Sequence, residues 1–308
     1  MFKINHGCFI LAINMSREEK IREIQALVSL IDEPDQKVFD EISSQIHSFG
    51  PEVIPFLEAH GEAVVDALAH KRIERLIHEI NFEEIVKEFE TWVSGGCVEL
   101  LPACILVARY RYPAILEEDI FREINKIRKE IWLELNENLT ALEQIRVFNH
   151  VFYEVQGFGG NTDNYHSPQN SYINKVLENR KGNPLSIGII YMHIAQSLDM
   201  PVFGINLPEH FVLAYTGTEP NPYTLEKNKQ VVLFYINAFS RGAVFSRQDV
   251  ELFLKQLNLP LNPDFFLPCR NPDIIKRMLN NLVNAYEKEG TDDRVAELDR
   301  LRKILDKR

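Results

Sequence analysis

The sequence GNPLSIGIIYMHIAQSLDMPVFGINLPEHFVLAY, residues 182–215, decides the fold of this chain. It opens on a Gly-x-Pro turn in which Asn183 is a natural N-cap and Pro184 suits the first helical position, where its missing N–H would have no partner anyway. A long apolar run follows. After an Asp-Met-Pro turn come two short runs rich in valine, isoleucine and aromatic residues, as strands are. This order predicts a helix over residues 184–198 and strands after it.

Strands that follow one another without alternating helices are typical of an antiparallel sheet in an α+β domain. We expect this sheet to contain residues 202–206, 209–216 and 231–236, with the 184–198 helix packed against it. The polar stretch TGTEPNPYTLEKNKQ between the last two strands predicts a hairpin loop. Residues 136–268 are therefore predicted to form an α+β core.

Both flanks of this core are predicted to be helical. In residues 15–135, apolar side chains recur at helical spacing, and the turns DEPDQ and FGPEV separate the helices. This pattern fits either a HEAT-like repeat or a plain helical bundle. Residues 269–308 predict a tetratricopeptide-like pair of helices that is joined at Gly290. One such pair cannot bury its apolar face alone, so we expect it to dock on its own domain.

The charge and hydropathy of the chain limit its partners. It has 308 residues, of which 45% are hydrophobic, enough to bury a sizeable core in two domains or in one with an appendage. Its 45 acidic and 34 basic residues give a net charge of -11, so nucleic acid is not an expected partner. No apolar stretch is long enough for a membrane helix. We expect Met15 to be the true start, with Ser16 capping the first helix, or residues 1–14 to be a loose leader.

The cysteines are few and irregularly spaced. They are Cys8, Cys97, Cys104 and Cys269, and they form no CxxC pair. This disfavours a disulfide framework and a structural zinc site. We expect a reduced, cytoplasmic protein that carries no cofactor.

A series of motifs in the middle of the chain points to a family. The motifs are Phe158-x-Gly160-Asn161, Tyr165, Asn170-Ser171, Val176-Leu177, Arg180-x-Gly182-x-Pro184-x-Ser186, Pro208 and His210-Phe211. With these motifs in order, the sequence closely resembles the SirB1-type (YchA-like) branch of the transglutaminase-like superfamily. The resemblance extends over residues 95–305, and it implies a transglutaminase-like, papain-like core.

The resemblance also implies a catalytic triad of Cys, His and Asp. The superfamily's cysteine lies at a helix N-terminus, where exposed N–H groups and the helix dipole favour the thiolate. In this chain the cysteine position corresponds to Pro184, the histidine to His210 and the aspartate to Asn237. The nearest hydroxyl is that of Ser186, which is either a substitute nucleophile or a small first-turn residue bonded to the local backbone. His210 is correspondingly either a base or a satisfied core histidine.

The loop GFGGNTDNYHSPQNSY, residues 157–172, is rich in glycine and in turn-forming asparagine. It either braces the cleft or contacts a ligand directly. The spacing of Asp163, His166 and His210 matches no recognised metal site, so no metal is predicted. The residues that we predict to bind in or line the cleft are Asn161, Tyr165, Asn170, Gly182 and Pro184.

Two functions are compatible with this degenerate triad. The first is a non-catalytic module that binds a peptide or protein partner through the cleft. The second is a hydrolase or acyl transferase that uses Ser186 and His210, and a short distance between the serine hydroxyl and the imidazole would favour it. We favour the first, because two of the three positions, Pro184 and Asn237, depart from the superfamily's Cys and Asp, and no cysteine lies between Cys104 and Cys269 to replace the thiol. We expect His210 and Asn237 to meet near the start of the 184–198 helix.

Overall fold

The computed structural model describes residues 17–217 and 232–306. The chain divides into two compact units, with the division between Glu84 and Ile85. The expectations for Met15, Ser16, Cys8 and the leader, and for most of the hairpin loop, fall outside the described residues.

The first unit is a small helical bundle. It contains α1 (Arg17–Val28), α2 (Gln36–Ser48), α3 (Ile54–Ala63) and the first part of α4 (Ala67–Ser94), around a core of aliphatic side chains. The buried guanidinium of Arg72 secures the α1–α2 connection, because its Nη1 donates to the carbonyl oxygens of Ile31 at 2.8 Å and Glu33 at 2.7 Å. The helices expected in this part of the chain are present.

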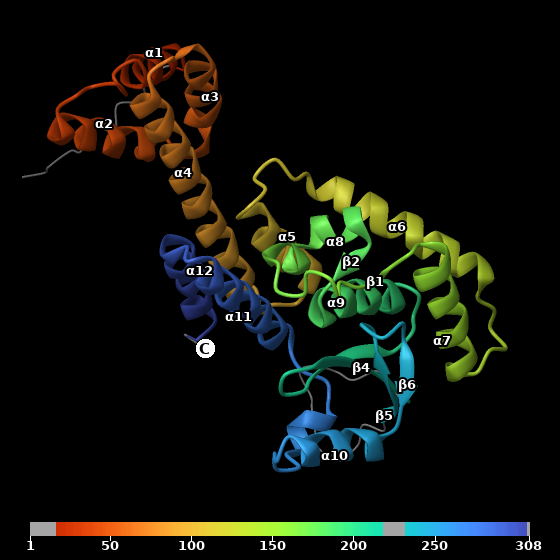
Figure 1. The fold of residues 1–308 in the computed structure, drawn as a ribbon. Helices are drawn as coiled ribbons and strands as arrows, with labels where there is room; N and C mark the ends of the chain where they lie inside the picture. Colours follow the sequence, from red (N-terminus) through yellow and green to blue (C-terminus); the bar gives the residue numbers. More distant parts are fainter. Residues whose placement is uncertain (1–16, 218–231, 307–308) are drawn as a thin grey trace, which may run out of the picture. The chain divides into compact units, whose positions relative to one another are not determined.

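The second unit begins with helices that surround one buried helix. After α5 (Leu100–Arg109), α6 (Glu117–Glu134) and α7 (Ala141–Asn149), one π-helical turn leads to the loop before α8 (Ile173–Asn179). The next helix, α9 (Pro184–Gln196), is buried along nearly its whole length. Because α9 is apolar all round, it must be covered on every side. Figure 1 shows α5, α6 and α8 on one side of it and the sheet on the other.

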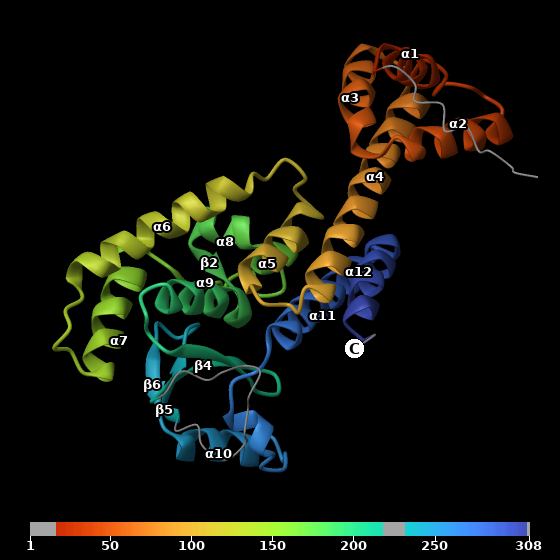
Figure 2. The same ribbon diagram turned by 180° about the vertical axis from the view of Figure 1, so that it is seen from behind.

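The sheet has four antiparallel strands in the order β3-β4-β5-β6. The strands are β3 (Val202–Asn206), β4 (Phe211–Thr216), β5 (Val232–Asn237) and β6 (Ala243–Phe245). Helix α9 packs on β3 and β4, and α10 (Arg247–Gln256) covers the other face through a second core cluster (Figure 2). The predicted α+β arrangement and three predicted strands are confirmed, and β6 is an additional strand.

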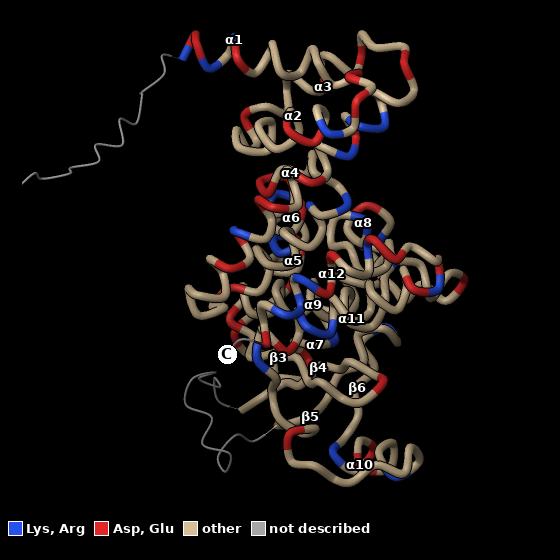
Figure 3. Tube along the Cα trace, turned by 90° about the vertical axis from the view of Figure 1, so that its left-hand side faces the viewer, with Lys and Arg blue, Asp and Glu red and all other residues tan. Residues whose placement is uncertain are grey.

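The C-terminal helices α11 (Asn271–Glu289) and α12 (Asp292–Leu305) pack on each other. Helix α11 also contacts α5, α9 and β3, and the buried Tyr286 hydroxyl lies 2.8 Å from that of Tyr172. The expectation that this pair docks on the rest of its own unit is confirmed. Basic and acidic residues are interspersed along the helices (Figure 3). Every helix in the described part of the chain falls short of the length and hydrophobicity that a membrane span requires.

Candidate functional site

The start of α9 is a closed capping box. Asn183 Oδ1 accepts from the Ser186 N–H at 2.9 Å, and Ser186 Oγ accepts from the Asn183 N–H at 3.1 Å. Pro184 occupies the first helical position, as expected from its fixed φ and missing donor. The capping box therefore supplies an acceptor to two N–H groups at this helix end.

Ser186 is held inside this cap. The residue is only 1% exposed, and its hydroxyl donates to the Asn170 carbonyl oxygen at 2.5 Å. Gly182 packs against it so closely that an added Cβ would lie 2.5 Å from Ser186 Oγ. Among the described residues, the Ser186 hydroxyl has hydrogen-bond partners only in Asn170 and Asn183, and His210 is not one of them.

His210 and Asn237 both line a pocket that does not include Ser186. Its volume is about 660 Å³, and it lies between the sheet and α10, with Val212 and Phe253 among its mainly apolar lining. Side chains alternate along a strand, so the residue that faces α9 is Phe211, whose ring would meet a Cβ on Gly188 at 3.0 Å. His210 thus lines the same pocket as Val212, two residues on.

Burial sets the protonation of this histidine. Desolvation lowers the pKa of His210, the hydrogen bond with the Asn237 side chain opposes that shift, and the charge of Arg277 adds to it. The imidazole is therefore neutral at pH 7. Its Nε2 is buried and has no hydrogen-bond partner within the described residues. Asn237 lines the same pocket, and its amide supplies no charge.

The asparagine-rich loop braces the start of α9. Asn161 Nδ2 donates to Asn170 Oδ1 at 2.9 Å, and Asn170 Nδ2 donates to the carbonyl oxygens of Asn164 at 2.7 Å and Tyr165 at 3.0 Å. The Asn161 N–H donates to the Gly182 carbonyl oxygen, also at 2.9 Å. Three of the predicted cleft residues, Asn161, Asn170 and Gly182, are thus part of one hydrogen-bonded brace.

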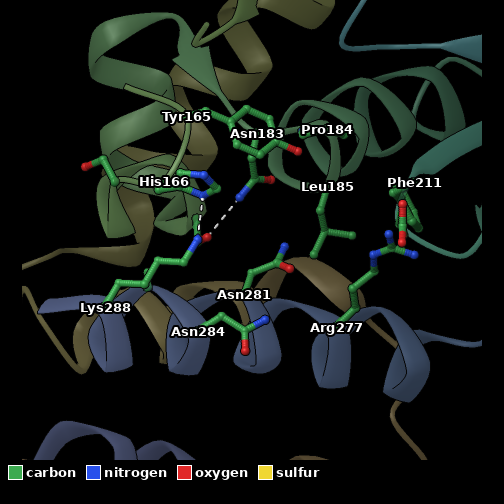
Figure 4. Close-up of a pocket in the computed structure, with 14 residues that line it drawn as sticks. Tyr165, His166, Asn183, Pro184, Leu185, Phe211, Arg277, Asn281, Asn284 and Lys288 are labelled. Atoms are coloured by element: carbon green, nitrogen blue, oxygen red, sulfur yellow. Dashed lines mark hydrogen bonds between the residues drawn. The ribbon is translucent and has the colours of Figure 1, made fainter. Parts of the chain in front are cut away.

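A second pocket, of about 220 Å³, opens at the start of α9 (Figure 4). Two predicted cleft residues, Tyr165 and Pro184, line it, together with His166 of the loop. In Figure 4 the side chains of α11 project from the opposite side. Those that line the pocket are Arg277, Asn281, Asn284, Ala285 and Lys288.

Charged groups mark both ends of this second pocket. Arg277 Nη1 donates to Asn206 Oδ1 and to the Leu207 carbonyl oxygen, each at 2.5 Å. Lys288 Nζ lies 3.2 Å from His166 Nδ1. Glu209 lines this pocket and the His210 pocket as well, so the two pockets are neighbours that share one residue. The structure therefore brings His210 and Asn237 together in one pocket and the Pro184 cap to the other.

The polar stripe of α11 was not predicted as part of the site. The spacing of its apolar residues predicts only the buried face of this helix. Positions 277, 281, 284 and 288 nevertheless recur at helical spacing, and asparagine is a poor helix former, so the repeated asparagines in NNLVN were a usable signal. No group of three or more potential metal ligands occurs within residues 17–217 and 232–306.

Comparisons with known proteins agree on one family. Residues 118–280, just over half of the chain, match the family model of the Transglutaminase-like superfamily. A UPF0162 protein of Xylella fastidiosa (strain Temecula1) is 34% identical over 222 residues, which cover 69% of this chain and 74% of that protein. A UPF0162 protein of Vibrio cholerae is 27% identical over 62% of this chain and 68% of its own length.

A relative of different architecture also matches. F-box only protein 21 of Homo sapiens is 30% identical over 145 residues, which cover 47% of this chain but only 22% of that protein. No solved structure matches the chain.

Proposed function

The chain belongs to the transglutaminase-like superfamily, and we propose that it is a non-catalytic member that binds a peptide or protein partner through the pocket at the start of α9. In this proposal the α9 helix and the four-stranded sheet are the papain-like core, and α11 and α12 are the tetratricopeptide-like pair that supplies one wall of the pocket. The superfamily's nucleophile position is then part of a binding surface.

The observation that carries the proposal is the position of Ser186. Its hydroxyl proton is directed to the Asn170 carbonyl oxygen, and its side chain is sealed beneath Gly182. A serine nucleophile needs access to substrate and a base within hydrogen-bond reach. His210 lines a different pocket, between the sheet and α10. This separation argues against a hydrolase or acyl transferase that uses Ser186 and His210.

The described thiols do not replace the missing nucleophile. Burial raises the pKa of Cys269 to about 12 and places the pKa of Cys104 higher still. Cys97 is also buried. Because the thiolate is the nucleophilic form, the protonated thiols of Cys104 and Cys269 are inert at neutral pH.

The pocket itself favours a short stretch of polypeptide as ligand. Its volume of about 220 Å³ is below the roughly 300–1,000 Å³ that cofactor and drug-sized ligands occupy. Its lining offers amide and cationic groups, which pair well with peptide groups and carboxylates. The match within F-box only protein 21, which covers a small share of that longer protein, supports a domain that acts as a module.

Binding to an immobilised library of random peptides tests the proposal. Asn284→Trp fills the pocket from an exposed position of α11, and Glu287→Trp places the same side chain on the same helix outside the pocket. We expect the wild type and Glu287→Trp to retain the same peptides and Asn284→Trp to lose them, with circular dichroism confirming the fold of each.

The competing enzyme hypothesis has its own outcome in the same samples. Ser186→Ala is expected to retain peptide binding, and no time-dependent turnover of peptide or γ-glutamyl substrates is expected. Turnover that disappears in Ser186→Ala or in His210→Ala would replace the binding module with a hydrolase or acyl transferase.

A further inference from the structure

We infer that the pocket at the start of α9 recognises an acidic peptide segment that lies extended along the polar face of α11. This inference rests on the proposed function and adds the chemical class of its ligand. Three features of the pocket support it: the spacing of the polar side chains on α11, their unused hydrogen-bonding groups, and the charges at the two ends of the row.

The spacing defines the length of the ligand. Arg277, Asn281, Asn284 and Lys288 share one face of α11, and Figure 4 shows them in a row that faces the loop and the start of α9. Arg277 and Lys288 are eleven positions apart, which corresponds to about 16 Å at 1.5 Å per helical residue. An extended peptide rises about 3.3 Å per residue, so two of its side chains about five residues apart match this separation.

The middle of the row can bind a peptide backbone. Within the described residues, no hydrogen bond is made by the side chain of Asn281 or of Asn284, although both line the pocket. A side-chain amide both donates and accepts, so it can pair with the C=O and the N–H of a peptide group. The asparagines of the loop differ, because Asn161 and Asn170 use their amides in the brace.

The guanidinium of Arg277 presents a free edge. Its Nη1 is occupied by Asn206 and Leu207, which fix the side chain, and no bond among the described residues uses Nε or Nη2. Those two nitrogens form the side of the guanidinium that binds a carboxylate in a bidentate manner. Arg277 is therefore positioned in advance for an acidic side chain.

The opposite end and the net charge complete the argument. Lys288 uses one N–H toward His166 and keeps two for a second carboxylate. Glu209 is the single acidic residue of the lining, and it forms no ion pair with Arg277 or Lys288 in the described structure. The chain as a whole carries a net charge of -11, so a pocket with two cations at its ends is not a consequence of composition.

Fluorescence anisotropy with the full chain and two labelled peptides tests this inference. The acidic probe is Gly-Glu-Gly-Ser-Ser-Gly-Glu-Gly, with its glutamates five residues apart, and the neutral probe replaces both glutamates by glutamine. We expect the acidic probe to bind about tenfold more tightly, since each exposed ion pair contributes modestly. Added salt should weaken the acidic probe and leave the neutral one nearly unchanged.

Charge reversal at one end provides the matched comparison. Lys288→Glu should weaken the acidic probe about tenfold, whereas Lys303→Glu, the same change at an exposed position of α12 outside the pocket, should leave it unaffected. Equal loss in both variants would mean that net charge alone is measured, and it would overturn the inference. Displacement of the acidic probe by an equal concentration of inorganic phosphate would indicate a general anion site and overturn it as well.

The two proposals fail in different ways. If both probes bind equally and Asn284→Trp abolishes both, the acidic preference is wrong and peptide binding stands. If neither these probes nor library peptides bind in a manner that depends on Asn284, the proposed function itself is wrong.

Discussion

The two neighbouring pockets of the second unit share Glu209 but differ in volume and in the polarity of their lining. The pocket at the start of α9 is lined by amides and cations and is braced by a hydrogen-bonded loop. The His210 pocket is mainly apolar and contains a neutral imidazole beside an amide. The comparison shows that Pro184 and His210, the positions predicted to correspond to the superfamily's cysteine and histidine, line different pockets.

The largest effect is expected where the brace at the start of α9 is broken. Asn170→Asp keeps the shape of the side chain but removes the N–H groups that bond to the Asn164 and Tyr165 carbonyl oxygens, and it places a carboxylate against them. Because the residue is 3% exposed, we expect the free energy of unfolding to fall by about 3 kcal/mol. Urea denaturation measures this. A loss as small as that of an exposed control, Asn138→Asp, would contradict the brace.

A smaller loss is expected from crowding beneath the α9 cap. Gly182→Ala places a Cβ 2.5 Å from Ser186 Oγ and 3.0 Å from a Val176 methyl group, so we expect about 2 kcal/mol of destabilisation from overpacking. Ser186→Ala alone should lose about 1 kcal/mol, because it removes the bonds that the hydroxyl makes with the Asn183 N–H and the Asn170 carbonyl oxygen.

The double variant tests whether the contact with Ser186 is what makes Gly182→Ala destabilising. Since the alanine at position 186 removes the atom that the new Cβ meets, Gly182→Ala/Ser186→Ala should be less destabilised than the sum of the two single variants. Strict additivity in a double-mutant cycle would show that the close contact is not what constrains Gly182.

The His210 pocket should be distinguished by its response to pH. Burial lowers the pKa of His210 in the folded state, so the unfolded chain binds the proton more readily. The contribution of the neutral imidazole to the free energy of unfolding is complete above the unfolded pKa, about 6.5. It is lost as the pH falls through that value toward the folded pKa. His193 contributes in the same direction, because its pKa is also lowered by burial.

Denaturation at a series of pH values checks this smaller effect. His210→Gln should flatten the decline in the free energy of unfolding between about pH 7.5 and pH 5.5, and His193→Gln should do so independently. Ser186→Ala should leave the shape of this pH dependence unchanged. An unchanged decline in His210→Gln would contradict the buried, neutral state of this imidazole.

Much of the core could be predicted from sequence because its signals are local. The Asn183 cap, Pro184 and the apolar run fix α9, and proline and glycine mark the ends of the strands. The sequence did not predict which β4 side chains face α9 and which face α10. All six residues of β4 are buried, since α9 covers one face and α10 the other, so hydropathy does not alternate along the strand.

The role of α11 could not be predicted for a related reason. Its apolar face follows from helical spacing, but the function of its polar face depends on what lies opposite. Arg277 meets Asn206, and Lys288 meets His166, across long stretches of chain that no local pattern connects. The repeated asparagines could be noticed from sequence, whereas the pocket that they line required the fold.

The smallest effect is expected from introducing cysteine at Pro184, the position predicted to correspond to the superfamily's cysteine. Pro184→Cys places a thiol at the first position of α9, where the helix N-terminus favours a thiolate. We nevertheless expect no turnover of peptide or γ-glutamyl substrates, because His210 lines the pocket on the α10 side of the sheet and the base must lie within hydrogen-bond reach. Mass spectrometry after iodoacetamide treatment verifies that the new thiol is accessible, with the wild type showing the background from its native cysteines. Activity in Pro184→Cys that is lost in Pro184→Cys/His210→Ala would join the two pockets into one active site. An alkylated but inactive Pro184→Cys would support the proposal that His210 does not serve as a base for position 184.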